Sequence, residues 1–301
     1  DANTSVIYSP YISRPYSSYP TNKPIVNIGT PTNGPISTSP INIQNQINNN
    51  NIEKNRNLMN HSSSFQQPQS QQQPKKKTLQ TLAKMYKNGV KIAMITAYDY
   101  PSALAADISD IDMVLVGDSL AMVALGHDNT TEITLDEMIH HCKAVARGCK
   151  RGFIVGDLPF GSYSNKTQAV ESSIRMIKEG RVEAIKIEGC NPEIVKEITS
   201  QGIPVVGHLG LTPQTATALG GYKVQGRTIQ KSVQILKDAL ALEEAGCFCI
   251  VLEAIPPEVA ELLTKYLTIP TIGIGAGPNC SGQVLVQLDA LGFNDSPPKF
   301  C

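Results

Sequence analysis

The sequence predicts an α/β protein, in which a disordered polar segment precedes a closed (β/α)8 barrel of parallel strands. Three observations lead to this prediction. The composition changes near residue 77, eight short apolar runs follow, and amphipathic helical patterns separate most of these runs. Strands that alternate with helices are typical of parallel β/α units, and eight such strands favour a closed barrel over an open sheet.

The first 76 residues are rich in Asn, Gln, Ser and Pro and have almost no aliphatic periodicity. Such a segment buries too little apolar surface to offset the entropy lost on ordering. We therefore expect residues 1–76 to be a disordered low-complexity segment and residues 77–301 to form the barrel domain. The lysines at the boundary, Lys75 to Lys77, are expected to be a solvated charge run.

The overall charge gives no sign of a polyanionic partner, because 26 basic residues balance 26 acidic ones. No run of 18 or more apolar residues occurs, so we expect a soluble protein without a membrane-spanning helix. The seven cysteines show no paired metal-ligand spacing, which predicts free thiols in a reducing compartment. Neither nucleic acid nor a membrane is therefore an expected partner, and the partners have to be inferred from local features of the sequence.

The apolar runs give the eight expected strands in order. Each run is short and is bounded by glycine or polar residues, as strands of a parallel barrel are. The runs cover residues 91–99, 112–120, 152–160, 184–189, 203–211, 247–256, 269–277 and, with a weaker pattern, 283–293.

Helical patterns occupy the gaps between most of these runs. Residues 167–180 and 230–246 each place apolar side chains at helical spacing and reach a glycine stop, at Gly180 and Gly246. The glycine-rich stretch 220–227 is expected to be a mobile loop over the barrel mouth that excludes water.

Five successive strands, the second to the sixth, are expected to end on an ionisable side chain. These are Asp118, Asp157, Glu188, His208 and Glu253. Because side chains alternate along a strand, Lys186 shares a face with Glu188. The active site of a parallel barrel opens at the carboxyl ends of its strands. We therefore expect all six side chains to point inward near the mouth.

Four carboxylates that converge on a partly dry barrel mouth require positive charge nearby. Lys186 supplies one cation. Carboxylates without a Cys or His cluster suit Mg²⁺, which one or two carboxylates hold together with waters and substrate oxygens. The alternative is that these acids pair with helix N-termini or with lysine and arginine side chains on neighbouring loops.

Nine sequence blocks between about Thr78 and Phe300 resemble one known family. They are ITAYDY (95–100), LVGDSL (115–120), GHD (126–128), DLPF (157–160), KIEG (186–189), GHLGLTPQ (207–214), GGYKVQGR (220–227), VLE (251–253) and IGIGAG (272–277). Together they are similar to the ketopantoate hydroxymethyltransferase family, whose members are also called 3-methyl-2-oxobutanoate hydroxymethyltransferases.

The resemblance implies a TIM-barrel enzyme that transfers a hydroxymethyl group from 5,10-methylenetetrahydrofolate to 3-methyl-2-oxobutanoate through a Mg²⁺-stabilised enolate. The product, 2-dehydropantoate (ketopantoate), belongs to the first dedicated step of pantothenate biosynthesis and so to the coenzyme A pathway. The resemblance also implies a homo-oligomer, commonly a decamer. Eukaryotic members imply a mitochondrial location, with the cytoplasm as the alternative.

The resemblance further implies a metal site and a base. Asp118 and Asp157 match the metal-binding aspartates of the family, and Glu188 matches an acidic member of the same site. Glu253 matches the proposed general base. A 2-oxo acid can chelate Mg²⁺ through its keto and carboxylate oxygens, which would acidify the C3 proton that the base removes.

Substrate binding is the role that the resemblance implies for a second, overlapping set. Its members are Ser119, Lys186 and His208 together with the aspartates Asp118 and Asp157. Lys186 can neutralise the substrate carboxylate as a compact charge.

Two other functions stay open at this point. A Mg²⁺-dependent lyase or mutase that acts on a 2-oxo acid would share the enolate chemistry, although such lyases often carry a catalytic cysteine loop that is not seen here. A non-catalytic interaction protein would not need the acids at the strand ends. The family pattern usually continues beyond the PKF that ends at Phe300, so we expect the barrel domain to be short at its carboxyl end.

Overall fold

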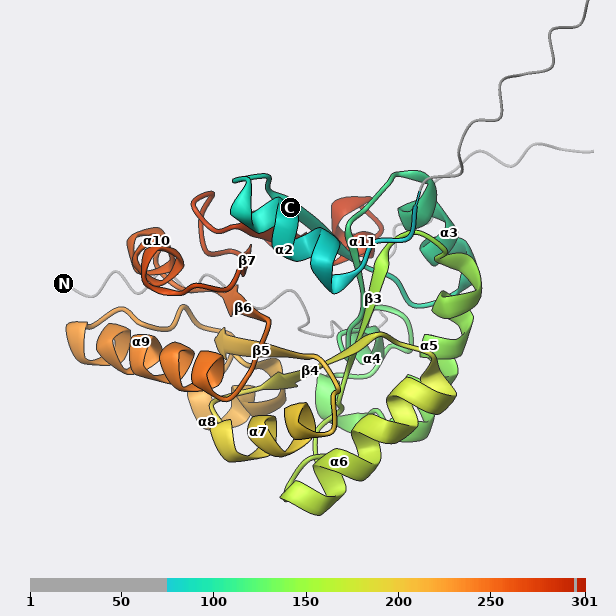
Figure 1. Cartoon of the computed structure of the whole chain (residues 1–301), viewed down its shortest axis with the longest axis horizontal. Coiled ribbons are helices and arrows are strands. Elements are labelled where there is room, and N and C mark those ends of the chain that lie inside the picture. The colour runs from blue at the N-terminus through green and yellow to red at the C-terminus, as the bar shows by residue number, and fades with distance from the viewer. Residues whose placement is uncertain (1–74, 295–296) are drawn as a thin grey trace, which may run out of the picture. The chain divides into compact units, whose positions relative to one another are not determined.

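A computed structural model of the chain describes residues 75–294 and 297–301. The expected disordered segment, 1–76, therefore lies almost wholly outside the described residues. Within them, eight parallel strands pair in sequence order, and β8 pairs with β1 to close a barrel. Helices such as α5, α6, α7 and α9 surround these strands (Figure 1). The predicted (β/α)8 barrel is confirmed.

The strands are short, and seven of the eight fall inside the predicted runs. Their bounds are β1 Ile92–Thr96, β2 Met113–Val116, β3 Phe153–Asp157, β4 Ala184–Glu188, β5 Val205–Gly210, β6 Cys249–Glu253, β7 Thr271–Ile274 and β8 Gly282–Leu285.

The eighth run is the exception, because the strand ends at Leu285 and the short helix α11 (Gln287–Ala290) follows. The expectation of a strand as far as residue 293 was wrong. The backbone N–H of Gln287 donates to Thr96 Oγ1 at 3.0 Å, and this contact turns the chain across the end of β1. The apolar spacing of this stretch fits a helical turn as well as a strand.

Helices precede β1 and occupy most of the connections between strands. The longer ones are α2 Leu79–Lys87, α3 Tyr100–Ile108, α5 Leu135–Gly148, α6 Lys166–Arg175, α7 Pro192–Ser200, α9 Ile229–Glu244 and α10 Pro257–Tyr266. The short ones are α4 Leu120–Val123, η2 Thr130–Glu132, the π-helical turn η3 Met176–Gly180, η4 Pro213–Thr215 and α8 Ala216–Leu219. No described helix combines the length and the apolar character that crossing a bilayer requires.

Local sequence explains where helices of the barrel begin and end. At the start of α5, the Thr134 side chain accepts from the Glu137 N–H, and the Glu137 carboxylate accepts from the Thr134 N–H at 2.8 Å. This reciprocal pair is a capping box. The predicted stop at Gly246 is confirmed, since this glycine follows α9 with φ +100°, a left-handed conformation that glycine adopts readily.

Helix α2 packs against the interior of the barrel on the side opposite the strand carboxyl ends. Its Leu82 is 1% exposed and joins a buried cluster with Ile92, Met113, Phe153 and Val206, whose side chains fill the barrel. The barrel is therefore a packed core below its mouth, as expected for this architecture.

Truncation of Leu82 to alanine is expected to lower the free energy of unfolding by about 2–5 kcal/mol, because it leaves a cavity in this core. Chemical denaturation of the full chain measures the loss. Leu291→Ala is the matched control, since Leu291 is 62% exposed. Equal stabilities of the two variants would show that α2 does not seal the barrel.

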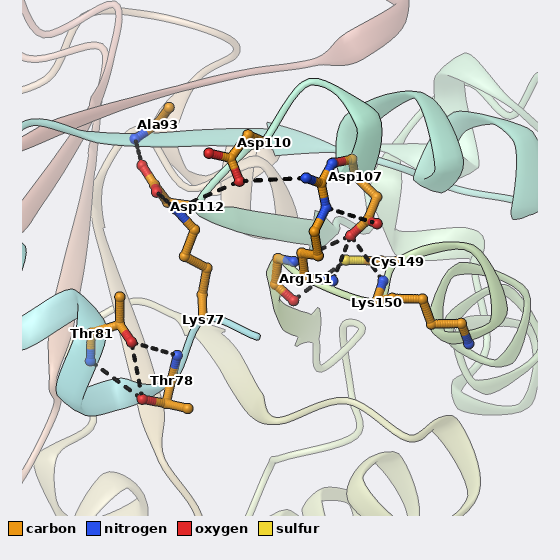
Figure 2. Close-up of polar contacts among 11 residues, drawn as sticks. Lys77, Thr78, Thr81, Ala93, Asp107, Asp110, Asp112, Cys149, Lys150 and Arg151 are labelled. Carbon is orange, nitrogen blue, oxygen red and sulfur yellow. Dashed lines mark hydrogen bonds and ion pairs between the residues drawn. The ribbon is translucent and has the colours of Figure 1, made fainter. Parts of the chain in front are cut away.

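The lysines before α2 are not a purely solvated run. Lys77 Nζ lies 2.9 Å from Asp112 Oδ1, while Asp112 Oδ2 accepts from the Ala93 N–H at 2.9 Å (Figure 2). Lys76 Nζ lies 2.7 Å from Glu183 Oε2. The sequence-based expectation is thus wrong for two of the three lysines, because carboxylates at the entry to β2 and β4 lie within their reach.

Candidate active site

The six ionisable side chains predicted at the strand ends meet in one pocket at the barrel mouth. Five of them are at most 7% exposed, and Glu253 is half-buried. The pocket encloses about 820 Å³ of empty space, including its opening to solvent. The buried members are Asp118, Asp157, Lys186, Glu188 and His208. The expectation that these side chains point inward is confirmed.

A short contact in the pocket joins β3 to β4. Lys186 Nζ lies 2.6 Å from Asp157 Oδ1. Burial lowers the pKa of Lys186, but the surrounding carboxylates, led by Asp157 and Glu188, hold it above its ordinary value. Lys186 therefore carries its positive charge inside the barrel.

His208 bridges two carboxylates across β4, β5 and β6. Its Nδ1 lies 3.3 Å from Glu188 Oε1, and its Nε2 lies 3.2 Å from Glu253 Oε2. Burial and Lys186 lower the pKa of His208, yet Glu188 and Glu253 outweigh them and raise it from 6.5 to about 9. Burial raises the pKa of Glu188, but the charge of His208 and the hydrogen bonds that the Glu188 carboxylate accepts lower this pKa overall.

This bridge predicts a pH dependence of stability for the metal-free protein. The pKa of His208 is about 9 in the folded state and 6.5 when unperturbed, so the folded state binds the proton more tightly. The stabilisation is complete below about pH 6.5 and is lost as pH rises to about 9, by an amount on the order of 3 kcal/mol. His208→Gln should remove this decline, which denaturation at several pH values measures.

The matched control for the pH experiment is His140→Gln on α5, where the imidazole is exposed. It should keep the decline of the parent protein. An equally steep decline in His208→Gln would contradict the assignment of the effect to His208.

Asp118 lies beside Asp157, and its backbone N–H donates to Asp157 Oδ2 at 3.0 Å. Burial, followed by the charges of Glu188 and Asp157, raises the pKa of Asp118 well above its ordinary value. Burial likewise raises the pKa of Asp157, although Lys186 opposes the shift. Without a further cation the two aspartates repel each other, so this part of the pocket favours added positive charge.

The pocket also contains buried polar atoms without a hydrogen bond of good geometry. Asp157 Oδ1, Glu188 Oε1 and His208 Nε2 are such atoms, although each has an oppositely charged group within ion-pair distance. Buried carboxylate oxygens with spare acceptor capacity fit a hard cation and its waters. Among the described residues, no group of three or more His, Cys, Asp or Glu could hold a metal ion by itself. A cation here would therefore need waters or substrate oxygens as further ligands.

Ser119 lines the same pocket beside the aspartates. Its Oγ lies 3.0 Å from Tyr98 Oη, which in turn accepts from Thr96 Oγ1 at 2.7 Å. The end of β1 thus holds the Ser119 hydroxyl at the pocket wall. The structure brings all seven sequence-predicted site residues together.

Sequence reasoning assigned no role to three further side chains near the mouth. Gln214 on η4 is 4% exposed and contacts Asp118, and Tyr163 donates to Gln214 Oε1 at 2.5 Å. Tyr222, in the glycine-rich loop, lines the pocket and donates to Met122 Sδ at 3.5 Å. The only signal for Gln214 and Tyr222 was their position inside the blocks at 207–214 and 220–227; nothing pointed to Tyr163.

A family model described as ketopantoate hydroxymethyltransferase matches residues 76–301. The chain belongs to the ketopantoate hydroxymethyltransferase family. The match spans the entire described barrel and includes every site residue named above. This chain is therefore an enzyme of the transferase class, as predicted.

The names of similar proteins agree with this family assignment. A 3-methyl-2-oxobutanoate hydroxymethyltransferase from Emericella nidulans is 54% identical over 244 residues, which cover 80% of this chain and 70% of the relative. One from Heliobacterium modesticaldum is 54% identical and covers 75% and 83% of the two chains. A rice relative, named as mitochondrial, is 56% identical; the match covers 74% of this chain but 58% of the relative.

Solved structures show that the fold of the ketopantoate hydroxymethyltransferase family is shared more widely. A phosphonopyruvate hydrolase, solved with oxalate and Mg²⁺, has a TM-score of 0.55 at 12% identity and covers 72% of this chain and 85% of its own. A 2,3-dimethylmalate lyase of the PEP mutase/isocitrate lyase superfamily has a TM-score of 0.53 at 16% identity and covers 71% and 82%. At these identities the likeness establishes the barrel fold alone.

Proposed function

We propose that this protein transfers a hydroxymethyl group from 5,10-methylenetetrahydrofolate to 3-methyl-2-oxobutanoate and forms 2-dehydropantoate, with Mg²⁺ as its metal ion. The observation that carries the proposal is the convergence of Asp118 and Asp157 with Lys186 and Glu253 in one buried pocket. The names of the relatives support the acceptor substrate. The low-identity likeness to a lyase adds no argument for lyase chemistry.

The metal would be held by Asp118 and Asp157, with waters and substrate oxygens as its further ligands, and Glu188 would be a third acidic member of the site that acts through a water. When bound, Mg²⁺ would polarise the keto group of the substrate and so acidify the neighbouring C–H bond. The repulsion between the two aspartates and the buried oxygens with spare acceptor capacity both support a cation at this position.

Lys186 and Ser119 would bind the acidic end of the substrate. The ammonium group of Lys186 is buried and charged, so it can pair with the substrate carboxylate where water does not screen the attraction. The Ser119 hydroxyl, held by Tyr98, can donate a further hydrogen bond. These contacts would orient C3 of the substrate toward β6.

Glu253 would take the proton from C3 of 3-methyl-2-oxobutanoate. Its carboxylate is half-buried at the end of β6, and the His208 imidazole 3.2 Å away orients it and stabilises its charge. The one-carbon unit would be transferred at the oxidation level of formaldehyde: water adds to the methylene carbon, both of its bonds to folate nitrogens break, and tetrahydrofolate is released as the second product. The C3 carbanion would add to the resulting carbonyl carbon, and the carbonyl oxygen takes up a proton to become the hydroxyl group.

The test incubates the purified full chain with the two substrates, once with Mg²⁺ and once with EDTA. Mass spectrometry then measures how much 2-dehydropantoate has formed. We expect product only when folate and Mg²⁺ are both present. A folded chain that binds Mg²⁺ without forming this product would overturn the proposed reaction. Turnover of a 2-oxo acid without folate would favour a lyase.

Cellular location and assembly are also part of this proposal. Relatives from Oryza sativa and Arabidopsis thaliana are named as mitochondrial, which supports a mitochondrial location. We further propose small molecules as the only ligands of the barrel and a homo-oligomer as the working form, with a decamer as the expectation from the family.

A further inference from the structure

Gln214 is the centre of a buried hydrogen-bond network beside the two candidate metal ligands. Its side-chain Nε2 donates to Asp118 Oδ2 at 2.8 Å and to the carbonyl oxygen of Leu158 at 3.0 Å. Its Oε1 accepts from Tyr163 Oη, and its backbone N–H donates to Glu188 Oε2 at 2.9 Å. One residue from η4 therefore contacts acids that belong to β4 and to the loop after β2.

The contacts allow only one orientation of the Gln214 amide. The Leu158 carbonyl can only accept a hydrogen bond, so the amide nitrogen has to face it and Asp118. The amide oxygen is then left to accept from the Tyr163 hydroxyl. In this arrangement Asp118 Oδ2 accepts a hydrogen bond from Gln214, whereas Asp118 Oδ1 forms no hydrogen bond with Gln214.

Tyr163 is itself held in place by the loop after β3. The Ser172 hydroxyl donates to the Ser162 carbonyl oxygen at 2.7 Å, and the Ser162 hydroxyl donates to the Pro159 carbonyl oxygen at 2.7 Å. Both serines are buried. The loop is thus tied to α6 on one side and carries the Tyr163 hydroxyl to Gln214 on the other.

We infer that Gln214 is a positioning residue for the Mg²⁺ site and that Tyr163 fixes the orientation of its amide. This inference rests on the proposed function, because it assumes that Asp118 binds the metal. Gln214 anchors Asp118 through its side chain and Glu188 through its backbone, so the two acids keep a fixed spacing before the ion arrives. Partners of this kind behind metal ligands commonly account for 10–100-fold in metal affinity.

A packing role alone would not explain this arrangement. A buried amide loses hydration, and an apolar side chain of similar size would fill the space without that cost. Gln214→Leu separates the two roles, because it removes all three side-chain hydrogen bonds and keeps the backbone contact to Glu188. Tyr163→Phe removes one hydroxyl and keeps the ring.

The experiment is calorimetric titration of MgCl₂ into the purified full chain, with melting temperatures recorded alongside. We expect Gln214→Leu to weaken Mg²⁺ binding roughly 10–100-fold and Tyr163→Phe to weaken it by a smaller factor, at least about threefold. Tyr86→Phe is the matched control, since the Tyr86 hydroxyl donates to the Leu267 carbonyl oxygen away from the pocket. This control should bind Mg²⁺ like the parent protein.

The outcomes separate this inference from the proposed function. A parent chain that binds no Mg²⁺ would overturn both. Binding by the parent, with unchanged affinity in Gln214→Leu and Tyr163→Phe, would overturn the positioning role and leave the proposed function intact. Should Gln214→Leu fail to fold, the comparison of Tyr163→Phe with Tyr86→Phe decides the question.

Discussion

Replacing Glu253 with glutamine is expected to lower the turnover number by a factor of roughly 10² to 10⁴. The amide has nearly the same shape as the carboxylate but cannot accept the C3 proton. Glu253 lies beside His208 rather than in contact with the aspartates, so Mg²⁺ affinity should change little. Steady-state kinetics and a Mg²⁺ titration on the same preparation measure the two effects separately.

Glu244→Gln is the matched control for this substitution, because Glu244 is an exposed residue at the end of α9. It should keep the turnover of the parent chain. Near-parental turnover in Glu253→Gln would mean that another group removes the proton. A loss of Mg²⁺ binding together with turnover would instead place Glu253 in the metal site.

Replacing Asp157 with asparagine is expected to reduce both Mg²⁺ affinity and turnover, by roughly 10² to 10³ each. The substitution removes one of the two carboxylates proposed to hold the ion. It also removes the carboxylate charge of Asp157, whose Oδ1 lies 2.6 Å from Lys186 Nζ. The buried ammonium group of Lys186 then lacks this anion. Melting temperatures should therefore be measured together with metal affinity.

The matched control is Asp136→Asn, because Asp136 also forms an ion pair, with Arg175, but its side chain is 79% exposed. Exposed pairs contribute about 0–1 kcal/mol, so this variant should match the parent protein in every measurement. If Asp157→Asn bound Mg²⁺ with parental affinity, the metal would have to lie elsewhere in the pocket.

Much of the barrel and its site could be predicted because both follow from short-range regularities. A strand of a parallel barrel is a short apolar run with polar ends, and the sequence repeats that pattern. Side chains alternate along a strand, so Lys186 and Glu188 had to share a face, and both are buried in the pocket. The closed barrel then brings strand ends together that are far apart in sequence, such as Asp118 and Glu253.

Other parts of the site depend on contacts between segments that no local pattern relates. Gln214 lies in the short helix η4 and Tyr163 in a loop, and no sequence period relates the directions of these two side chains. They meet because the connections after β3 and β5 lie near each other, with both strands next to β4. The ion pair of Lys77 with Asp112 likewise requires the three-dimensional position of α2. In the last run, the apolar spacing suits both a strand and a helix, and for this reason the predicted strand extended past Leu285, where β8 ends.

The packed barrel interior limits how reactants reach the acids. Within the described part of the chain, side chains such as Leu82, Met113 and Val206 fill the space below the pocket, so the pocket opens at the strand carboxyl ends. With the substrates proposed above, both reactants would use this one opening. The oxo acid would lie deeper than the folate, so it would bind first, and its product would leave after the folate. The packed barrel interior would then impose an ordered sequence of binding and release.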